Sequence, residues 1–147
     1  MKKIVKILAL AGVAAVIAVS LFADQKGWER LTDEAIDNYQ AGRHDEAIRI
    51  ARLALAEGER TFGPEDLKIV GSLDNLATYL ARIDKYDEAD KLYRRALSIL
   101  EAKLPSDDRY LAIFMDYLAV FYEKTGSVEY ANELRARAKA IRFKKRE

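Results

Sequence analysis

Apolar residues recur at three- and four-residue spacing through nearly all of the chain after residue 24, which is the pattern of amphipathic α-helices. The pattern breaks at Gly42, Asp84 and Gly126, and the only two prolines, Pro64 and Pro105, fall between periodic runs. Glycine adopts the left-handed conformation that often ends a helix at least cost, aspartate tolerates it less well, and proline cannot continue a helix. These breaks predict helices over residues 25–41, 44–61, 65–83, 86–103, 107–125 and 128–143.

The helical pattern itself repeats, with a period of 42 residues that separates Ala47, Ala89 and Ala131. A fixed period of about 20 to 50 residues indicates stacked repeats, in which neighbours cover one another's apolar faces. The same step links Leu31, Leu73 and Met115; Ala35, Ala77 and Ala119; Ile50, Leu92 and Leu134; and Ala54, Ala96 and Ala138. The sequence therefore predicts an all-α solenoid of three helix-turn-helix pairs, at about residues 25–61, 65–103 and 107–143.

Small residues are expected at the helix crossings, where an alanine lets two helix axes approach closely. Ala77 and Ala89 take this place in the middle pair, and Ala119 and Ala131 in the last. The larger residues expected to fill the space around them are Leu76, Leu80, Tyr86, Tyr93, Leu118 and Tyr122.

Acidic pairs stand at two predicted helix starts. Ser106 is the expected N-cap of the fifth helix, with Asp107 and Asp108 in its first turn, where the helix dipole favours negative charge. Glu65 and Asp66 stand at the start of the predicted third helix. We interpret both pairs as caps and dipole partners rather than as a catalytic acid and base.

Residues 1–23 form a separate apolar segment. Three lysines within its first six residues precede an uncharged run from Ile7 to Ala23. This is the pattern of a secretory signal, which a peptidase would cut after Ser20 or Ala23. The run is also just long enough to cross a bilayer, so retention as a membrane anchor over residues 4–23 is the alternative, and the imperfect cleavage pattern favours it.

Both alternatives place the rest of the chain on the same side of the membrane, because the lysines stay in the cytoplasm under the positive-inside rule. The short basic start is typical of bacteria. We therefore expect a protein of the bacterial cell envelope. Its body would be periplasmic and anchored in the inner membrane, or periplasmic or secreted if the segment is cleaved.

Charge is distributed unevenly along the chain. Residues 24–134 carry 15 basic and 23 acidic side chains, whereas residues 135–147 carry seven basic and one acidic. An acidic body argues against nucleic-acid binding. One interpretation of the basic end is contact with anionic lipid. The interpretation that we prefer is that its positive charge complements the end of the last helix and continues into a solvated tail over residues 144–147.

Candidate chemistry is sparse. His44 is the only histidine, and the chain has no cysteine. A catalytic or metal-binding histidine usually needs a partner at recognisable spacing, and none is found. His44 follows the predicted turn at Gly42, where we expect it to face solvent. The sequence has no phosphate-binding glycine loop and no nucleophile motif, so it predicts no enzyme, no metal site and no cofactor.

The middle pair resembles a tetratricopeptide repeat. The resemblance rests on Leu76-Ala77, Tyr86-Asp87-Glu88-Ala89, Tyr93 and Ala96-Leu97. With its period of 42 rather than the usual 34, the chain is similar to the repeats of kinesin light chains over about residues 28–142. The His-Pro dipeptide of that family is absent. Polar residues replace apolar ones in the terminal repeats (Glu34, Arg135 and Lys139), as in a capped array.

The resemblance implies a right-handed superhelix, whose first helices line a concave groove for an extended peptide or a partner helix. Some relatives clamp a terminal carboxylate, for which Asn75, Arg82 and Lys124 are candidates. The alternative is that the groove positions are only solvated helix faces. Carried onto this sequence, the groove residues are Thr32, Ile36, Tyr39, Gln40, Asp74, Asn75, Thr78, Arg82, Asp116, Tyr117, Val120 and Lys124.

These observations together predict a non-catalytic, membrane-tethered adaptor that binds a peptide or helix of a cell-envelope protein. The alternative function is that of a cleaved, soluble periplasmic or secreted subunit of a larger assembly.

Overall fold

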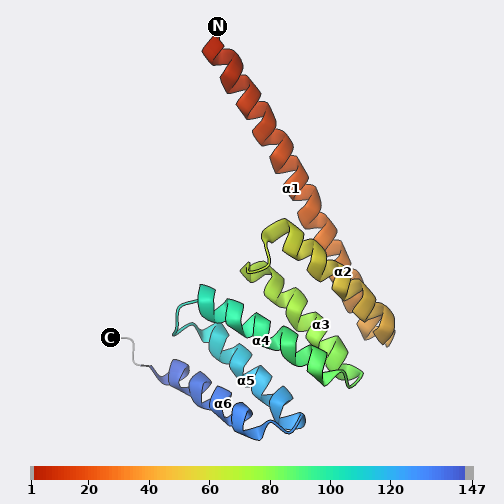
Figure 1. Ribbon diagram of the computed structural model, residues 1–147, viewed down its shortest axis with the longest axis vertical. Helices are drawn as coiled ribbons and strands as arrows, with labels where there is room; N and C mark the ends of the chain where they lie inside the picture. Colours follow the sequence, from red (N-terminus) through yellow and green to blue (C-terminus); the bar gives the residue numbers. More distant parts are fainter. Residues whose placement is uncertain (1, 145–147) are drawn as a thin grey trace. The chain divides into compact units, whose positions relative to one another are not determined.

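The computed structural model describes the backbone of residues 2–144 and the side chains of residues 18, 20 and 22–144. Every regular element in this part of the chain is helical, which confirms the all-α class (Figure 1). The elements are α1 (Lys2–Gln40), α2 (His44–Phe62), the 3-10 helix η1 (Leu67–Ile69), α3 (Val70–Arg82), α4 (Tyr86–Lys103), α5 (Arg109–Lys124) and α6 (Val128–Phe143). The chain divides into two compact units, Met1–Pro64 and Glu65–Glu147.

Helix α1 begins far before the predicted residue 25, since its backbone is helical from Lys2 onward. Most of the predicted anchor or signal segment lies outside the residues whose side chains are described. Within the described residues, no helix has a stretch that is both long enough and apolar enough to span a bilayer. The anchor over residues 4–23 therefore stays a prediction.

The turns inside the three helical pairs share one geometry. Gly42, Asp84 and Gly126 all have left-handed backbone angles, with φ of 75°, 61° and 87°. In each turn, the next residue donates its N–H to the carbonyl five residues earlier, at 2.9, 3.0 and 2.8 Å. This bond satisfies a carbonyl that the helix end leaves free, as in a Schellman motif. The predicted role of these three residues is confirmed.

The first unit pairs α1 with α2. Ala35 and Ala47 are almost fully buried where the two helices pack. Trp28 of α1 meets Phe62 of α2 edge to face, with ring centroids 5.2 Å apart, and closes the far end of the pair.

The second unit contains two helical pairs, α3 with α4 and α5 with α6, and α4 also packs on α5. Ala77, Ala89, Ala119 and Ala131 have no exposed surface, as expected of residues at helix crossings. Among the large residues predicted around them, Leu76, Leu80, Tyr93, Leu118 and Tyr122 are buried. Tyr86 is 42% exposed, so its predicted core role is wrong. It is the first residue of α4, beyond the crossing, and its hydroxyl donates to Asp84 at 2.5 Å.

Two predicted caps differ in the structure. Helix α5 begins at Arg109, and Asp108 rather than Ser106 is its N-cap, accepting the Tyr110 N–H at 2.7 Å. Residues 105–108 form a turn closed by the Asp108 N–H and the Pro105 carbonyl, which delays the helix start. Before α3, Asp66 accepts the Lys68 N–H at 2.8 Å, but it caps η1 rather than an α-helix.

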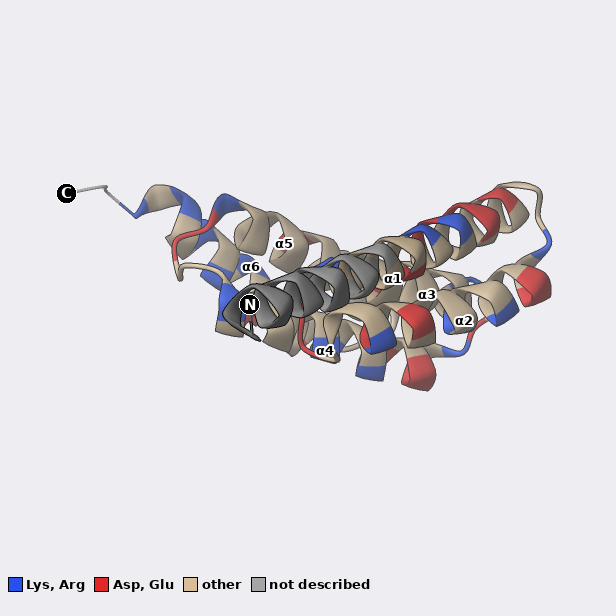
Figure 2. Ribbon diagram, turned by 90° about the horizontal axis from the view of Figure 1, so that it is seen from above, with Lys and Arg blue, Asp and Glu red and all other residues tan. Residues whose placement is uncertain are grey.

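Lys and Arg residues recur along α6 (Figure 2), and three of them form ion pairs. Arg135 pairs with Glu123 at 2.6 Å, and Arg142 pairs with Asp116, so both link α6 to α5. Arg137 pairs with Glu101 of α4. Part of the basic charge of α6 therefore pairs with single acidic side chains of α4 and α5 in the same unit.

Candidate functional site

An exposed apolar stripe runs along α5. Tyr110, Ile113, Tyr117 and Val120 are separated by three, four and three residues, so they lie on one side of the helix. They are 50%, 54%, 43% and 46% exposed. Single exposed apolar residues are normal on a protein surface, but these four are aligned on one helix, which makes them a candidate interaction site. The residues of this stripe, together with Asp74 and Thr78 of α3, are called the α3–α5 face below.

Hydroxyl groups join the two helices of this face. The Thr78 hydroxyl lies 2.8 Å from the Tyr117 hydroxyl and 3.1 Å from that of Tyr93, and the two tyrosine hydroxyls are 3.1 Å apart. Tyr93 belongs to α4 and is almost fully buried. Burial raises its pKa well above the ordinary value, so its hydroxyl stays protonated. The three hydroxyls thus form a hydrogen-bonded triangle, which holds the Tyr117 ring between the exposed stripe and the core.

Asp74 is a half-buried carboxylate on the same face, one helical turn before Thr78. Its Oδ1 is inaccessible to solvent and has no hydrogen-bond partner. Burial raises its pKa from 3.8 to about 6. Burial is the main cause of the raised pKa of Tyr110, and the negative charge of Asp74 adds to it. These two side chains therefore lie near each other. A buried carboxylate without a donor is costly, because buried polar groups are normally hydrogen-bonded.

The structure brings three of the predicted groove residues into direct relation, namely Asp74, Thr78 and Tyr117, with Val120 continuing the stripe. Asn75 is half-buried beside Asp74, while Arg82 and Lys124 are exposed at the ends of α3 and α5. Asp116 instead pairs with Arg142 of α6, so we leave it out of the α3–α5 face. The carboxylate clamp of Asn75, Arg82 and Lys124 stays a prediction.

The four predicted groove residues of α1 belong to the first unit. Thr32 donates its hydroxyl to the Trp28 carbonyl at 2.9 Å, and Ile36 is half-buried. Tyr39 lies against the His44 ring, with centroids 5.4 Å apart, and Gln40 is exposed at the end of the helix. Their part in binding stays a prediction.

His44 was expected to face solvent, but its ring is half-buried. Its Nδ1 is inaccessible to solvent and has no hydrogen-bond partner. The reason is that His44 begins α2 and packs on Tyr39 near the end of α1. In the part of the chain that the structure describes, no group of three His, Cys, Asp or Glu side chains is placed to hold a metal ion.

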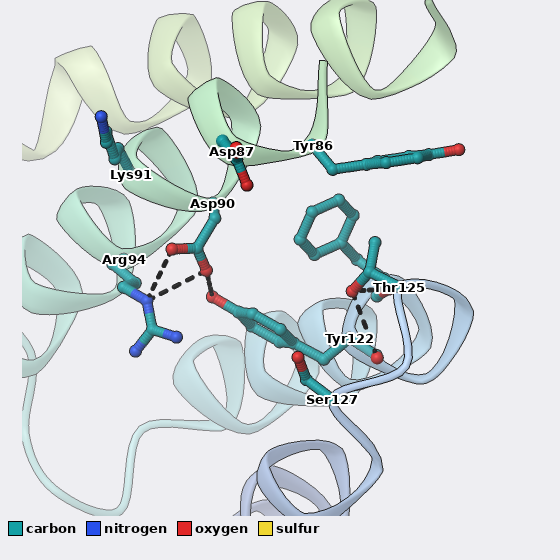
Figure 3. Close-up of a pocket in the computed structure, with 9 residues that line it drawn as sticks. Tyr86, Asp87, Asp90, Lys91, Arg94, Tyr122, Thr125 and Ser127 are labelled. Atoms are coloured by element: carbon teal, nitrogen blue, oxygen red, sulfur yellow. Dashed lines mark hydrogen bonds and ion pairs between the residues drawn. The ribbon is translucent and has the colours of Figure 1, made fainter. Parts of the chain in front are cut away.

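A hollow lies between α4, the end of α5 and the turn into α6 (Figure 3). Its volume is about 640 Å³. Asp90 stands at its wall, where it accepts hydrogen bonds from Arg94 Nε at 2.9 Å and from the Tyr122 hydroxyl at 2.6 Å. The Arg94 guanidinium also lies over the rings of Tyr122 and Tyr130. Because these groups satisfy one another, we interpret the network as a connection between repeats.

Sequence reasoning missed two residues of the α3–α5 face, Tyr110 and Ile113. Their signal was present, since they extend the spacing of Tyr117 and Val120 toward the start of α5. The Asp90–Tyr122 bond had no such signal, because it joins residues from different repeats across the packed pairs.

Part of the chain matches a known repeat family. Residues 31–102 match the model of the tetratricopeptide repeat. This segment of the chain belongs to the tetratricopeptide-repeat family. The match covers most of the first two helical pairs and confirms the resemblance in the middle one. No curated protein sequence matches the chain.

Solved structures are similar to this chain in fold. BtubC (BKLC) from P. vanneervenii has a TM-score of 0.72 and 25% identity, over 82% of this chain and 47% of that one. A Podosopora anserina protein with nearly identical TPR-like repeats, named for kinesin light chain, has a TM-score of 0.68 and 24% identity. That match covers 79% of this chain and 55% of the other. The chain thus spans about half the length of the structures it matches.

Proposed function

We propose that this chain is a non-catalytic interaction module, which binds a peptide or helix of a partner protein on the α3–α5 face. Tetratricopeptide repeats stack into extended surfaces that hold other molecules. The observation that carries the proposal is the exposed stripe of Tyr110, Ile113, Tyr117 and Val120. Tyrosine is among the residue types enriched at binding hot spots.

The dimensions of the stripe suit a short linear segment. From Tyr110 to Val120 the helix rises by about 15 Å, at about 1.5 Å per residue. An extended peptide covers this length with about five residues, and a helix covers it with about three turns. Because the Tyr117 ring is held by the hydroxyls of Thr78 and Tyr93, the surface is formed before the partner arrives. Such preorganisation reduces the entropic cost of binding.

Site-specific photocrosslinking tests the binding face. A photoreactive amino acid is placed at Ile113 of the full chain in native membranes, and in a control at Asn132, an exposed residue of α6 outside the face. We expect a discrete protein adduct from position 113 and none from position 132. Equal adducts at both positions, or an adduct from position 132 alone, would refute the assignment of the face.

The proposal includes a tether to the inner membrane of a bacterial cell, with the repeats on the periplasmic side. It is supported by Lys2, Lys3 and Lys6 followed by the uncharged run from Ile7 to Ala23. A tether confines the repeats near other envelope proteins, which raises the effective concentration of a membrane-bound partner. The partner is accordingly expected in the cell envelope.

Fractionation tests the tether. Full-length chain is expected to stay in carbonate-washed membranes, whereas a variant lacking residues 2–23 is expected in the cytosol. Mass spectrometry of the mature amino terminus is read in parallel. Release of the full chain by carbonate, or a mature terminus at Leu21 or Asp24, contradicts the tether and favours the soluble subunit of a larger assembly.

A further inference from the structure

We infer that the partner segment presents a lysine or arginine side chain to the carboxylate of Asp74, between apolar residues that cover the α5 stripe. This inference rests on the proposed function, since it specifies the chemistry of a segment bound on the α3–α5 face. The observation behind it is that the face has hydrogen-bond acceptors without donors, on Asp74 and on the hydroxyls beside it.

The first step concerns the unused acceptor on Asp74. Its Oδ1 is inaccessible to solvent and has no donor within the protein. The burial that raises the pKa of Asp74 to about 6 still leaves the carboxylate mostly ionised at neutral pH. An ionised carboxylate accepts hydrogen bonds and donates none. Asp74 is only half-buried, so a ligand can reach the exposed part of the carboxylate, and it must bring donors to do so.

The second step concerns the three hydroxyls beside it. Thr78, Tyr93 and Tyr117 form three mutual hydrogen bonds. Each hydroxyl has one hydrogen, so three bonds use all three hydrogens and leave only lone pairs. The triangle therefore has no donor left for Asp74, but it can still accept one. Carboxylate and hydroxyls together form a surface that accepts and does not donate.

The third step selects the ligand. Lysine has three N–H donors and no acceptor, and arginine has five and no acceptor. Hydrogen bonds between such cations and a carboxylate are about twice as strong as neutral ones. The tyrosine rings at positions 110 and 117 add an aromatic surface over which a cation is attracted. The apolar stem of the same side chain can lie along the exposed stripe.

Charge complementarity also opposes the alternative occupants of this part of the face. An acidic side chain or a terminal carboxylate beside Asp74 would meet a like charge, which costs affinity. The basic residues Arg82 and Lys124 stand at the ends of α3 and α5. Arg82 is about 12 Å along α3 from Asp74, at about 1.5 Å per residue. An acidic residue of the partner would therefore lie toward that end, and the cationic residue toward Asp74.

Selection from a random library tests the inference. Nonapeptides displayed on phage are selected on full-length chain in lipid nanodiscs, in parallel on Asp74→Asn and on Asp116→Asn. The second variant is a matched control, because it removes the same charge one repeat later from a carboxylate that Arg142 already pairs. A selected peptide is then synthesised with its lysine or arginine retained or replaced by norleucine, and fluorescence anisotropy measures both affinities.

We expect peptides selected on the unmodified chain to carry Lys or Arg between apolar residues, and norleucine to weaken their binding about tenfold or more. On Asp74→Asn, the same replacement is expected to change affinity less than about twofold. On Asp116→Asn, it is expected to weaken binding about tenfold or more, as on the unmodified chain. Selected peptides without the cation, or an unchanged preference on Asp74→Asn, would overturn the inference while leaving the binding face in place. Failure to select any peptide on the unmodified chain would contradict the binding face itself.

Discussion

Replacing Asp74 by Asn should stabilise the folded protein at neutral pH. Burial raises the pKa of the Asp74 carboxyl from 3.8 to about 6, so the folded state disfavours the ionised form. Well below pH 3.8 the carboxyl is neutral in both folded and unfolded chains, and it carries no penalty. As pH rises from about 4 to about 6, the unfolded chain loses this proton first, and the stability contributed by the site falls. Above pH 6 the penalty is complete and constant.

The magnitude follows from the two pKa values. A separation of about two pKa units corresponds to about 3 kcal/mol, at 1.36 kcal/mol per unit. Asp74 is only half-buried, and solvent screening reduces this to about 1–2 kcal/mol. Asparagine keeps the shape and removes the charge, so most of that penalty should disappear in the variant. The expected gain is a large share of the total stability of a small domain.

Urea unfolding, followed by circular dichroism, measures this gain for the full chain, for Asp74→Asn and for the control Asp116→Asn. The quantity that matters is the difference in unfolding free energy between variant and unmodified chain, because other titrating groups are common to both. For Asp74→Asn it should grow by about 1–2 kcal/mol between pH 4 and pH 7. A difference that is independent of pH, or a variant that is less stable at pH 7, would refute the account of Asp74 as an unpaired buried charge.

Further substitutions test the turns, the repeat packing and the face. Asp84→Gly should stabilise the protein by about 0.5–1 kcal/mol and Gly126→Ala should destabilise it by about 1 kcal/mol, both in urea unfolding, because these positions have left-handed backbone angles. Tyr122→Phe removes a bond to a carboxylate on α4 and should cost about 1–2 kcal/mol, whereas the exposed Tyr86→Phe should change stability by under about 0.5 kcal/mol. Val120→Asp should weaken binding of a selected peptide more than about tenfold in anisotropy while the unfolding midpoint hardly changes, since the side chain is exposed. A variant that binds normally would remove Val120 from the face.

The fold could be predicted closely because its signals are local and periodic. The left-handed turns at Gly42, Asp84 and Gly126 fix the helix ends, and the 42-residue step identifies the alanines at the crossings. The start of α5 could not be predicted as well, because a turn after Pro105 competes with the expected cap at Ser106.

The site could be predicted only in part. Asp74, Thr78 and Tyr117 follow from the resemblance to the tetratricopeptide repeat, which implies a groove lined by first helices. Their hydroxyl triangle with Tyr93 could not be predicted, because it joins three helices and depends on side-chain positions in three dimensions. The ion pair that takes Asp116 out of the face could not be predicted either, because its partner Arg142 lies 26 residues away in the sequence.

Chemical-shift mapping of the full chain in nanodiscs with a selected peptide tests most directly whether the first helices of the second unit form the binding surface. We expect the largest amide and side-chain shifts at Asp74, Thr78, Ile113, Tyr117 and Val120, with saturation on titration. Shifts centred instead on the outer sides of α4 and α6, or around the hollow beside Tyr86, would contradict the account.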